Sequence, residues 1–575
     1  MKILGINDGH NASACLYIDG QIAAAIQEER LRRVKNWAGF PSHSVREVCR
    51  IANVAASDID FVAMNGEYAA RPMTRETLME EYRTINDFRT SIWRNVRRQV
   101  RRAAKLTPIF GIRRQGQQRQ RLQELAELGV PADRALFVEH HTAHASAAYY
   151  GWGRFSDDVL VLTCDGAGDG LCATVSIGRN GRLERLAEIP QSDSIANIYA
   201  MITYLMGMVP LEHEYKLMGL APYADPEKAG QFFRELCSLM RFDAATPLTW
   251  ERTERCPETY CSYAFFRDLL ERRRFDAIAG GLQRFTEHML TTWVANCVRQ
   301  TGIRRVALSG GIFMNVKANK LIMELPEVDE LFVYPSCGDE TNAMGAAYAV
   351  YADRAGCASM QPLRDVYWGP EHSDAEIERA IRGFAFTSRV TFRHADPIEP
   401  VVAELLAQGT VVARFKGREE FGARAMGNRS LLADPRSVDA VRVLNEAIKS
   451  RDFWMPFAGS VLEECSDSLY QNEKNVPAPY MILSFDTTGR WRDILAAIHP
   501  FDHTMRPQEV SSEWNPSYHS LISAFARRTG VPAVLNTSFN LHGHPIVSRP
   551  EDALDVLDRS GLTHHALGNR LVEKQ

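Results

Sequence analysis

Three short apolar runs in the first two thirds of the chain each end in residues that can bind a metal ion or a phosphate. Residues 136–138 precede Glu-His-His-Thr-Ala-His-Ala, residues 159–164 precede Asp-Gly-Ala-Gly-Asp, and residues 331–334 precede Pro-Ser-Cys-Gly-Asp-Glu. Short apolar runs bounded by turn residues are typical of buried strands, and ligands bind at the carboxyl ends of such strands. The pattern predicts an α/β fold in which these strand ends carry the chemistry.

The histidines after the first run have the spacing of a metal-binding helix. Positions four apart share a helix face, so His140 and His144 point the same way while His141 turns aside. Asp165 and Asp339 stand at the other two strand ends, so two imidazoles and two carboxylates could converge on one divalent ion. An HxxxH pair alone is weak evidence, because such histidines are more often solvated or core residues. The two aspartates favour the metal site.

Length and composition limit the classes of protein to consider. With 575 residues the chain is too long for one ordinary core, so two or more domains are expected. Its net charge of −4 gives no bias toward nucleic acid or an anionic membrane. We expect a cytoplasmic protein, because no signal peptide precedes the first strand and no apolar run has membrane-spanning length. The 11 cysteines contain no CxxC pair and are interpreted as buried free thiols.

The chain begins with a pattern of three strands. Residues 2–6, 12–18 and 21–26 predict a β-meander, with a Gly-containing loop at 7–11 and a two-residue turn at 19–20. Such a hairpin can wrap a phosphate with backbone N–H groups, as in the actin and sugar-kinase fold. The simpler interpretation is an ordinary hairpin at the start of an α/β domain.

A basic helical insertion is predicted from residue 71 to about residue 130. The simpler interpretation is a solvated, salt-bridged helical excursion outside the core, and the alternative is a platform for an anionic acceptor or an acidic protein partner. The basic residues in this segment are Arg94, Arg97, Arg98, Arg101, Arg102, Lys105, Arg113, Arg114, Arg119 and Arg121.

Two later stretches favour nucleotide binding in the same domain. Residues 213–222 cluster charge beside Gly-Leu-Ala-Pro, which suits a site edge or a helix cap equally well. Residues 305–308 predict a strand that ends in Ser-Gly-Gly before a helix, where a phosphate or ribose can bind. No GxxxxGK[ST] motif is present, so a P-loop is excluded. The glycines after residue 164 would also let a nucleotide approach the backbone. The candidate nucleotide-binding residues are Asp165, Gly166, Lys216, Ser309, Gly310, Gly311 and Asn315.

The chain is expected to divide into a domain at 1–356, a linker at 357–374 and a second α/β domain at 375–575. In the second domain a strand at 410–415 leads into residues 416–430, where four cations interleave with three glycines. Guanidinium forks match phosphate oxygens and glycine lets the backbone approach them. Each motif is more often structural, but together they favour anion binding. The candidates are Lys416, Arg418, Arg424, Arg429, Arg451, Arg506, Asn536 and Ser538.

A series of motifs resembles one known family. HHTAHA, DGAGD, EYKLMGLAPY, LSGGIFMN, CGDETNAMGAA, KGREEFGARAMGNRS, RDFWMPFAGSV and VLNTSFN occur in this order. They are similar to the carbamoyltransferase family that includes the tobramycin and nodulation-factor O-carbamoyltransferases. The resemblance implies an actin/sugar-kinase-like (ASKHA) domain, similar to the tRNA threonylcarbamoyladenosine transferase, followed by a YrdC-like domain. It covers nearly the whole chain except the basic insertion.

The resemblance also implies a reaction. In such enzymes carbamoyl phosphate is converted to carbamate in the second domain, and ATP turns carbamate into carbamoyl-adenylate. The adenylate passes internally to the first domain, where a hydroxyl of a natural product or glycoside takes the carbamoyl group, as in antibiotic biosynthesis. ATP and carbamoyl phosphate would be substrates, a small-molecule hydroxyl compound the acceptor, and Fe2+ the expected metal. Oligomerisation is left open.

Residues are assigned from the resemblance by position. His140, His144 and Asp339 match the metal ligands, and Asp165 would contribute to the metal or the nucleotide. His10 matches a proposed general base, for which an imidazole is suited at neutral pH. The remaining matches are Lys35, which would contact the carbamoyl intermediate, and Arg418 or Arg424, Arg451, Arg506 and Ser538 for carbamoyl phosphate and ATP.

Two other functions compete with O-carbamoyl transfer. The tRNA-modifying relative would explain the basic insertion, and its second domain would bind L-threonine and bicarbonate. Its relatives usually keep the two domains on separate chains, which counts against it. A catalytically inactive adenylate-binding regulator is the third hypothesis, and the retained His, Asp and Arg sets argue against that.

Overall fold

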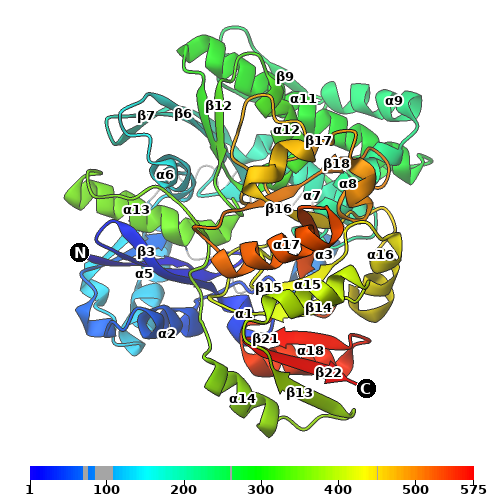
Figure 1. Cartoon of the computed structure of the whole chain (residues 1–575). Helices are drawn as coiled ribbons and strands as arrows, with labels where there is room; N and C mark the ends of the chain where they lie inside the picture. Colours follow the sequence, from blue (N-terminus) through cyan, green and yellow to red (C-terminus); the bar gives the residue numbers. More distant parts are fainter. Residues whose placement is uncertain (69–74, 85–107, 260–261, 450) are drawn as a thin grey trace. The chain divides into compact units, whose positions relative to one another are not determined.

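The computed structural model describes residues 1–68, 75–84, 108–259, 262–449 and 451–575, and the chain is mixed α/β as predicted (Figure 1). It forms two compact units. The first comprises Met1–Glu28 and Asn36–Leu363, and the second comprises Glu29–Lys35 and Arg364–Gln575. The change of unit at Leu363 lies inside the predicted linker at 357–374. None of the described helices has the length and apolarity that a membrane span requires.

The first unit contains the same sheet topology twice. One 5-stranded sheet has the order β3-β2-β1-β4-β5 and the other has the order β12-β11-β6-β7-β8. In each, an antiparallel meander is extended by two parallel strands. The repeat is the one expected of the actin/sugar-kinase-like class. The strands are β1 (Lys2–Asn7), β2 (Ser13–Ile18), β3 (Gln21–Gln27), β4 (Phe61–Asn65), β5 (Ala135–Val138), β6 (Val159–Gly168), β7 (Leu171–Arg179), β8 (Arg182–Pro190), β11 (Arg305–Ser309) and β12 (Glu330–Val333).

Two helices pack each repeat against the other. Helix α6 (His140–Trp152) follows β5 of the first sheet but packs on β6 and β11 of the second. Helix α13 (Asn342–Ala355) follows β12 of the second sheet but packs on β1 and β4 of the first. The two helices also pack on each other, and a Cβ on Gly345 would overlap the carbonyl of Ala143. The ends of both sheets are therefore brought to one place.

The first unit also contains a further set of helices and a small two-stranded sheet. Gly302 ends the long α11 in a left-handed conformation, as a glycine after a helix commonly does. The helices are α2 (Ser42–Ile51), α3 (Arg75–Thr84), α5 (Pro108–Glu127), α7 (Ile195–Leu205), α8 (Glu214–Leu220), α9 (Pro226–Cys237), α10 (Tyr263–Leu270), α11 (Phe275–Thr301) and α12 (Val316–Glu324), with a small sheet of β9 (Met240–Phe242) and β10 (Trp250–Arg252).

Two sequence expectations about the first unit need amendment. The aspartate–glycine stretch was expected to end the strand at residue 164, but β6 continues to Gly168 and the turn comes at Asp169. Of the basic insertion, helices α3 and α5 are described and the arginines at 94–102 lie outside the described residues. Arg121 of α5 is 1% exposed, so this residue is part of the core rather than of a solvated platform.

The second unit is built on an 8-stranded mixed sheet with the order β13-β22-β21-β14-β15-β20-β16-β19. Its apolar core includes Phe415, Leu431, Leu535 and Phe539. The strands are β13 (Val390–His394), β14 (Val412–Phe415), β15 (Arg429–Ala433), β16 (Ala458–Leu462), β19 (Pro507–Val510), β20 (Ala533–Ser538), β21 (His564–Leu567) and β22 (Arg570–Lys574), with β17 (Phe485–Asp486) paired to β18 (Thr504–Met505). The helices are α14 (Asp374–Gly383), α15 (Glu399–Ala407), α16 (Val438–Leu444), α17 (Pro516–Thr529) and α18 (Pro550–Arg559).

The second unit is completed by a segment from near the N-terminus. Helix α1 (Glu28–Arg32) carries Arg30, whose side chain is 1% exposed. Its Nη1 lies 2.6 Å from Glu419 Oε1 and donates to the carbonyl of Glu420 at 2.6 Å. Its Nη2 donates to the carbonyl of Gly422 at 2.6 Å. Residues 29–35 carry no local signal that separates them from their neighbours in sequence, because this ion pair joins residues far apart in the chain.

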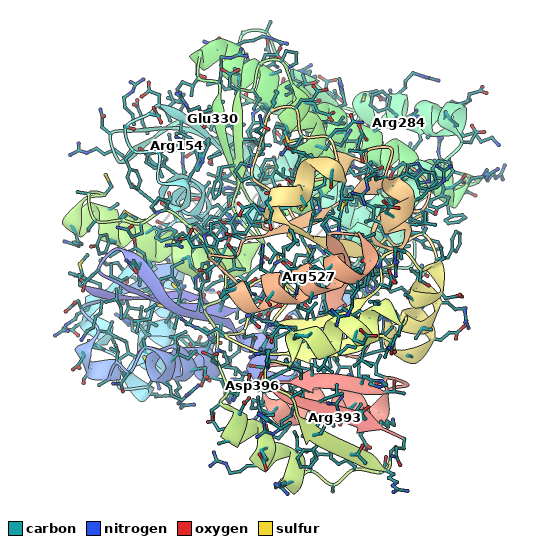
Figure 2. The ribbon with its side chains drawn as sticks, viewed as in Figure 1. Arg154, Arg284, Glu330, Arg393, Asp396 and Arg527 are labelled. Atoms are coloured by element: carbon teal, nitrogen blue, oxygen red, sulfur yellow. The ribbon has the colours of Figure 1, made fainter. Side chains whose placement is uncertain are left out.

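Most other ion pairs lie on the surface. Arg154, after α6, lies 2.7 Å from Glu330 of β12, and Figure 2 labels both side chains. Both are more than a third exposed, and exposed pairs of this kind contribute about 0–1 kcal/mol. The buried Arg30–Glu419 pair is therefore the stronger candidate for an effect on stability.

Replacing Arg30 by methionine should destabilise the second unit by about 3–5 kcal/mol, because it leaves the Glu419 carboxylate buried without its cation. Urea unfolding followed by circular dichroism measures the change. Arg50→Met is the matched control, since Arg50 forms an exposed pair with Glu47 and should cost less than about 1 kcal/mol. Equal effects of the two substitutions would contradict the assignment.

Candidate metal and anion sites

The N-terminus of α6 is held by two carboxylates. Glu139 accepts hydrogen bonds from the backbone N–H groups of His141 at 2.9 Å and Thr142 at 2.8 Å. Asp169 Oδ2 accepts one from the N–H of His140 at 2.9 Å. These N–H groups have no partner within the helix, and negative charge is favourable there. Burial would raise the pKa of Glu139, but Arg185 and the helix N–H groups lower it to about 2. The helix that carries the histidines is fixed at its first turn.

His140, His144, Asp165 and Asp339 come together in the first unit. Both imidazoles present Nε2 to the carboxylates. His140 Nε2 lies 3.2 Å from Asp165 Oδ2 and 3.7 Å from Asp339 Oδ1. For His144 Nε2 the corresponding distances are 3.6 and 3.5 Å. His141 turns aside, as the helical spacing predicts, and its Nδ1 lies 2.8 Å from Thr163 Oγ1.

The four side chains depend on one another electrostatically. Burial would lower the pKa of His140, but Asp339 and Asp165 raise it to about 9. Burial would likewise raise the pKa of Asp165, but its bonds to the two imidazoles hold it well below its usual range. The carboxylates therefore require positive charge beside them. In the absence of a metal, protons on the imidazoles supply it.

The donor set fits a divalent metal ion. One ligand atom from each of the four residues lies within 4.8 Å of the others. Donors about 2.1 Å from a shared ion lie roughly 3–4 Å apart, which is the range of the four distances above. Two imidazole nitrogens and two carboxylate oxygens suit Fe2+, Mn2+ and Zn2+. The geometry fits the expected Fe2+ and fits Mn2+ and Zn2+ equally well.

Ser309 orients His144: its Oγ lies 3.1 Å from Nδ1, the ring nitrogen that does not face the carboxylates. A partner at that nitrogen fixes the ring orientation of a ligating histidine. Asn342 Nδ2 lies 3.1 Å from Nε2, the nitrogen that would bind the metal, so a bound ion would replace this contact. Ser309 was predicted as a nucleotide residue, and the structure places it beside the imidazole. Asn342, Asp169 and Glu139 were not among the predicted site residues. Only Glu139, an acidic residue directly before the helical pattern, carries a sequence signal.

Glycines let the backbone approach the cluster closely. A Cβ on Gly168 would overlap the ring of His140, and a Cβ on Gly311 would lie 2.8 Å from Asp165 Oδ1. Gly310 has a φ of 113°, which suits glycine, and its N–H donates to the carbonyl of Cys337 at 2.9 Å. The predicted Ser-Gly-Gly strand end therefore packs against the aspartate of the neighbouring strand.

The other residues predicted to bind a nucleotide also lie in the first unit. Gly166, expected just after the strand, is within β6, and Lys216 is half-buried in α8. Asn315 caps the N-terminus of α12, accepting from the N–H of Ala318 at 3.1 Å. Its amide also exchanges hydrogen bonds of 2.9 Å with Gln283. Asn315 is thus held by the protein in this conformation.

The loop after β1 presents His10. Asn7 Nδ2 donates to the carbonyl of His10 at 2.9 Å, and Asn11 adopts a left-handed φ of 52°, which asparagine tolerates. His10 Nε2 is buried and has no hydrogen-bond partner among the described residues. Ser13 Oγ, at the start of β2, donates to the carbonyl of Glu340 at 2.7 Å, next to Asp339. A half-buried imidazole with an unused nitrogen is therefore available in the same unit as the metal cluster.

A group of cations lies in the second unit. Burial lowers the pKa of Arg506 well below its usual range, and the neighbouring charges of Arg424 and Arg451 lower it further. Burial also lowers the pKa of Lys449, with Arg451 and Lys35 acting in the same direction. Arg506 Nε is buried without a hydrogen-bond partner among the described residues. Because neighbouring buried cations repel one another, binding of an anionic ligand between them is favourable.

Ser538 lies beside this group. Lys449 Nζ donates to its hydroxyl at 3.1 Å, and Arg451 Nη2 donates to Thr537 Oγ1 at 3.1 Å. Lys449 and Arg451 therefore approach the end of β20, where Ser538 stands. The predicted Arg451, Arg506 and Ser538 lie in one region of the unit.

The remaining predicted anion-binding residues have protein partners. Lys416 lies 2.7 Å from Glu399, and Arg418 donates to the carbonyls of Trp368 at 2.7 Å and Gly369 at 3.3 Å. Arg429 is fully buried and donates to the carbonyl of Gly417 at 3.0 Å. The amide of the buried Asn536 donates to the carbonyl of Ala425 at 3.0 Å and to Ser460 at 2.9 Å. These residues shape the loop at 416–428, whereas Arg424 acts electrostatically on Arg506 and so belongs to the cation group.

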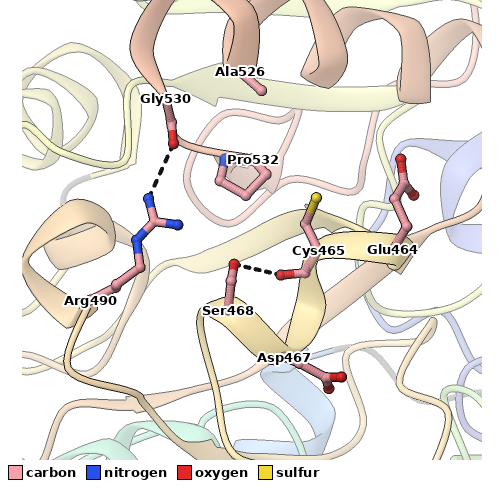
Figure 3. Close-up of a pocket in the computed structure, with 8 residues that line it drawn as sticks. All are labelled: Glu464, Cys465, Asp467, Ser468, Arg490, Ala526, Gly530 and Pro532. Atoms are coloured by element: carbon pink, nitrogen blue, oxygen red, sulfur yellow. Dashed lines mark hydrogen bonds between the residues drawn. The ribbon is translucent and has the colours of Figure 1, made fainter.

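A separate surface pocket of about 500 Å³ opens elsewhere in the second unit, and Figure 3 shows its lining. Arg490 donates to the carbonyl of Gly530 at 3.1 Å and pairs with Asp493 at 2.8 Å. Glu464, on the other side, lies 3.0 Å from His519. Arg490 is the cation in this lining and is already paired with Asp493, so the pocket is not part of the anion site.

Family comparisons match both parts of the chain. A family described as "Carbamoyltransferase N-terminus" matches residues 2–348, and one described as "Carbamoyltransferase C-terminus" matches residues 403–574. Nodulation protein NolNO of Sinorhizobium fredii is 31% identical over 98% of this chain and 79% of its own length. Nodulation protein NolO of Bradyrhizobium diazoefficiens is 30% identical over 76% of this chain and 79% of its own length.

Two solved structures are also similar to part of the chain. Component A of the (R)-2-hydroxyglutaryl-CoA dehydratase of Acidaminococcus fermentans is 15% identical, with a TM-score of 0.33, and the match covers 61% of this chain and 98% of that one. Full-length HypF in its phosphate- and nucleotide-bound form is 13% identical, with a TM-score of 0.30, and the match covers 62% of this chain and 56% of that one.

Replacing His144 by alanine should lower the affinity for Fe2+ by more than about 100-fold, because even an outer partner of a metal ligand can contribute 10–100-fold. Metal content after anaerobic loading with Fe2+, measured by mass spectrometry, should fall from one ion per chain to none. The control is His288→Ala, an exposed histidine on α11. Retention of one ion by His144→Ala would contradict the site.

Replacing Gly168 by alanine should weaken Fe2+ binding while leaving all four ligands in the sequence, because the added methyl group would displace the His140 ring. We expect a loss of about 10–100-fold, similar to that of an outer-partner substitution. Gly116→Ala is the matched control, since nothing lies within 4 Å of a Cβ at that position. Unchanged affinity in Gly168→Ala would show that the ring can move without cost.

Proposed function

The chain belongs to the carbamoyltransferase family, and from that premise we propose that it is an ATP-dependent O-carbamoyltransferase. The proposed substrates are ATP, carbamoyl phosphate and a hydroxyl group of a small molecule, such as a natural product or glycoside. The cation group formed by Arg424, Arg451 and Arg506 carries the proposal, because like charges held together favour a phosphorylated substrate.

In the proposed first half-reaction the second unit makes carbamoyl-adenylate. Arg424, Arg451 and Arg506 would bind the phosphate oxygens of carbamoyl phosphate, and water would complete its cleavage to carbamate and inorganic phosphate. A carbamate oxygen would then attack the α-phosphorus of ATP, and pyrophosphate would leave. Lys35, grouped with the second unit and acting electrostatically on Lys449, would stabilise negative charge in this step.

In the proposed second half-reaction the acceptor hydroxyl attacks the carbonyl carbon of the adenylate in the first unit. The bond from that carbon to the adenylate oxygen breaks, and AMP leaves. His10 would take the hydroxyl proton on Nε2, which is the right type of group for a general base at neutral pH. The buried, unpartnered state of Nε2 supports this role.

A divalent ion at the cluster of His140, His144, Asp165 and Asp339, for which we propose Fe2+, would stabilise negative charge on the adenylate phosphate as a Lewis acid. The chain's own part is to hold these donors in place. Asp169 and Glu139 fix the first turn of α6, and Ser309 orients His144. A water-poor site would protect the labile adenylate.

The test separates the two half-reactions. Exchange of labelled pyrophosphate into ATP, dependent on carbamoyl phosphate, reports adenylate formation, and AMP release with water as the acceptor reports discharge. Arg506→Ala should lower the exchange by about 100-fold or more, as expected when a preorganised cation is lost. His10→Ala should keep the exchange and lower AMP release by about 100-fold.

The control for the second unit is Arg492→Ala, because Arg492 stacks on Trp491 at 4.3 Å, outside the cation group. It should leave both rates unchanged. Exchange that depends on threonine and bicarbonate instead of carbamoyl phosphate would support the tRNA-modifying alternative. Full exchange activity in Arg506→Ala would refute the proposed anion site.

A further inference from the structure

We infer that Arg121, from helix α5 of the basic insertion, is a positioning residue for His10 and acts through Asp8. The inference rests on the proposed role of His10. Arg121 would then have a function in the site, although the simpler interpretation of the basic insertion is a solvated helical excursion.

The contact between Arg121 and Asp8 is a buried ion pair with one hydrogen bond. Arg121 is 1% exposed and Asp8 is 5% exposed. Nη2 of Arg121 donates to Asp8 Oδ1 at 2.9 Å, and Nε lies 2.7 Å from Oδ2. The guanidinium also lies over the ring of Phe137, 5.0 Å from its centre. A planar guanidinium fixes the direction of its donors as well as the charge, and a lysine could not reproduce this arrangement.

The ion pair fixes one side of the loop that presents His10. Asn7 fixes the other side: its Nδ2 donates to the carbonyl of His10 at 2.9 Å, and its Oδ1 accepts from the N–H of Gly9 at 3.2 Å and from Asn65 Nδ2 at 3.0 Å. Asp8 lies between these anchored residues. A movement of the Asp8 carboxylate would therefore carry the backbone of His10 with it.

Removing Arg121 would make the present loop conformation costly. Burial raises the pKa of Asp8, and Arg121 opposes that rise by its charge and its hydrogen bond. Glu124, on the same helix, carries charge of the same sign and does not replace the lost cation. A buried carboxylate without its partner is strongly unfavourable, so it would take up a proton or move toward water. Either change would disturb the loop.

The same guanidinium reaches toward the metal helix. Nη1 donates to the carbonyl of Gly66 at 2.8 Å, and Nη2 donates to the carbonyl of Asn65 at 2.6 Å. The next residue, Glu67, donates its N–H to Asp169, whose carboxylate also holds the N–H of His140. Arg121 thus connects the loop of His10 with the first turn of α6. It fixes His10 relative to the proposed metal ligands.

The test compares Arg121→Met with Arg119→Met, an exposed arginine on the same helix. Arg121→Met should lower AMP release with water as the acceptor by about 10–100-fold, because a small misplacement of a catalytic group costs rates of this order. Carbamoyl-phosphate-dependent pyrophosphate exchange should stay within about twofold of the native rate, since the second unit is unchanged. Arg119→Met should alter neither rate.

Three further measurements distinguish positioning from general damage. Reaction of His10 with diethyl pyrocarbonate, measured by peptide mass spectrometry relative to the exposed His288, should rise in Arg121→Met and not in Arg119→Met. Arg121→Lys, which keeps the charge without the fork, should recover part of the lost AMP release. If Arg121→Met does not fold, Asp8→Asn tests the same contact, because an amide carries no charge to pair with the guanidinium, and it should also lower AMP release.

The outcomes separate this inference from the proposed function. The inference alone would be overturned if His10→Ala lost AMP release while Arg121→Met and Asp8→Asn kept native rates and native reactivity of His10. Native AMP release in His10→Ala would overturn the proposed role of His10, and with it the inference. Equal loss of exchange and of AMP release in Arg121→Met would show a general structural effect and would also overturn it.

Discussion

Two carboxylates and two imidazoles lie close together in the first unit. The cost of burying the carboxylates without compensating charge accounts for several of the contacts around them. Buried carboxylates require compensating positive charge, which protons on the imidazoles or a metal ion can supply. Each group is then costly to remove, because its partners remain buried. The supporting residues follow from this requirement: Asp169 and Glu139 hold the helix that carries the imidazoles, and Ser309 orients His144.

The repeated sheet topology explains how residues far apart in sequence reach one place. In the two copies, β5 corresponds to β12 and β1 corresponds to β6. The first pair leads to the histidine helix and to Asp339, and the second pair leads to the loop of His10 and to Asp165. The first copy therefore contributes the imidazoles and the second contributes the carboxylates, at corresponding places in the two sheets. The exchange of helices between the sheets, with α6 on the second and α13 on the first, brings these ends together.

Arginine has two different roles in this protein, and the partner of the guanidinium distinguishes them. Arg30, Arg121 and Arg429 are almost fully buried and donate to backbone carbonyls, and the first two also pair with buried carboxylates. Such residues tie together segments that are distant in sequence. Arg424 and Arg451 instead lower the pKa of the buried Arg506 as like charges, so an anion beside the group would be favourable. Residue type and motif membership do not separate the two roles.

Local physics explains what the sequence by itself determined. Helical spacing places His140 and His144 on one face and turns His141 away, because the helix repeat depends only on neighbouring residues. Apolar runs likewise identify the two strands near which Asp165 and Asp339 lie, and the order of motifs identifies the family. Only the tertiary structure decided that Ser309 supports His144, that Arg429 and Asn536 are bonded within the protein, and that residues 29–35 complete the second unit. These outcomes depend on partners separated by many residues, and a local pattern contains no information about which distant group will meet a given side chain.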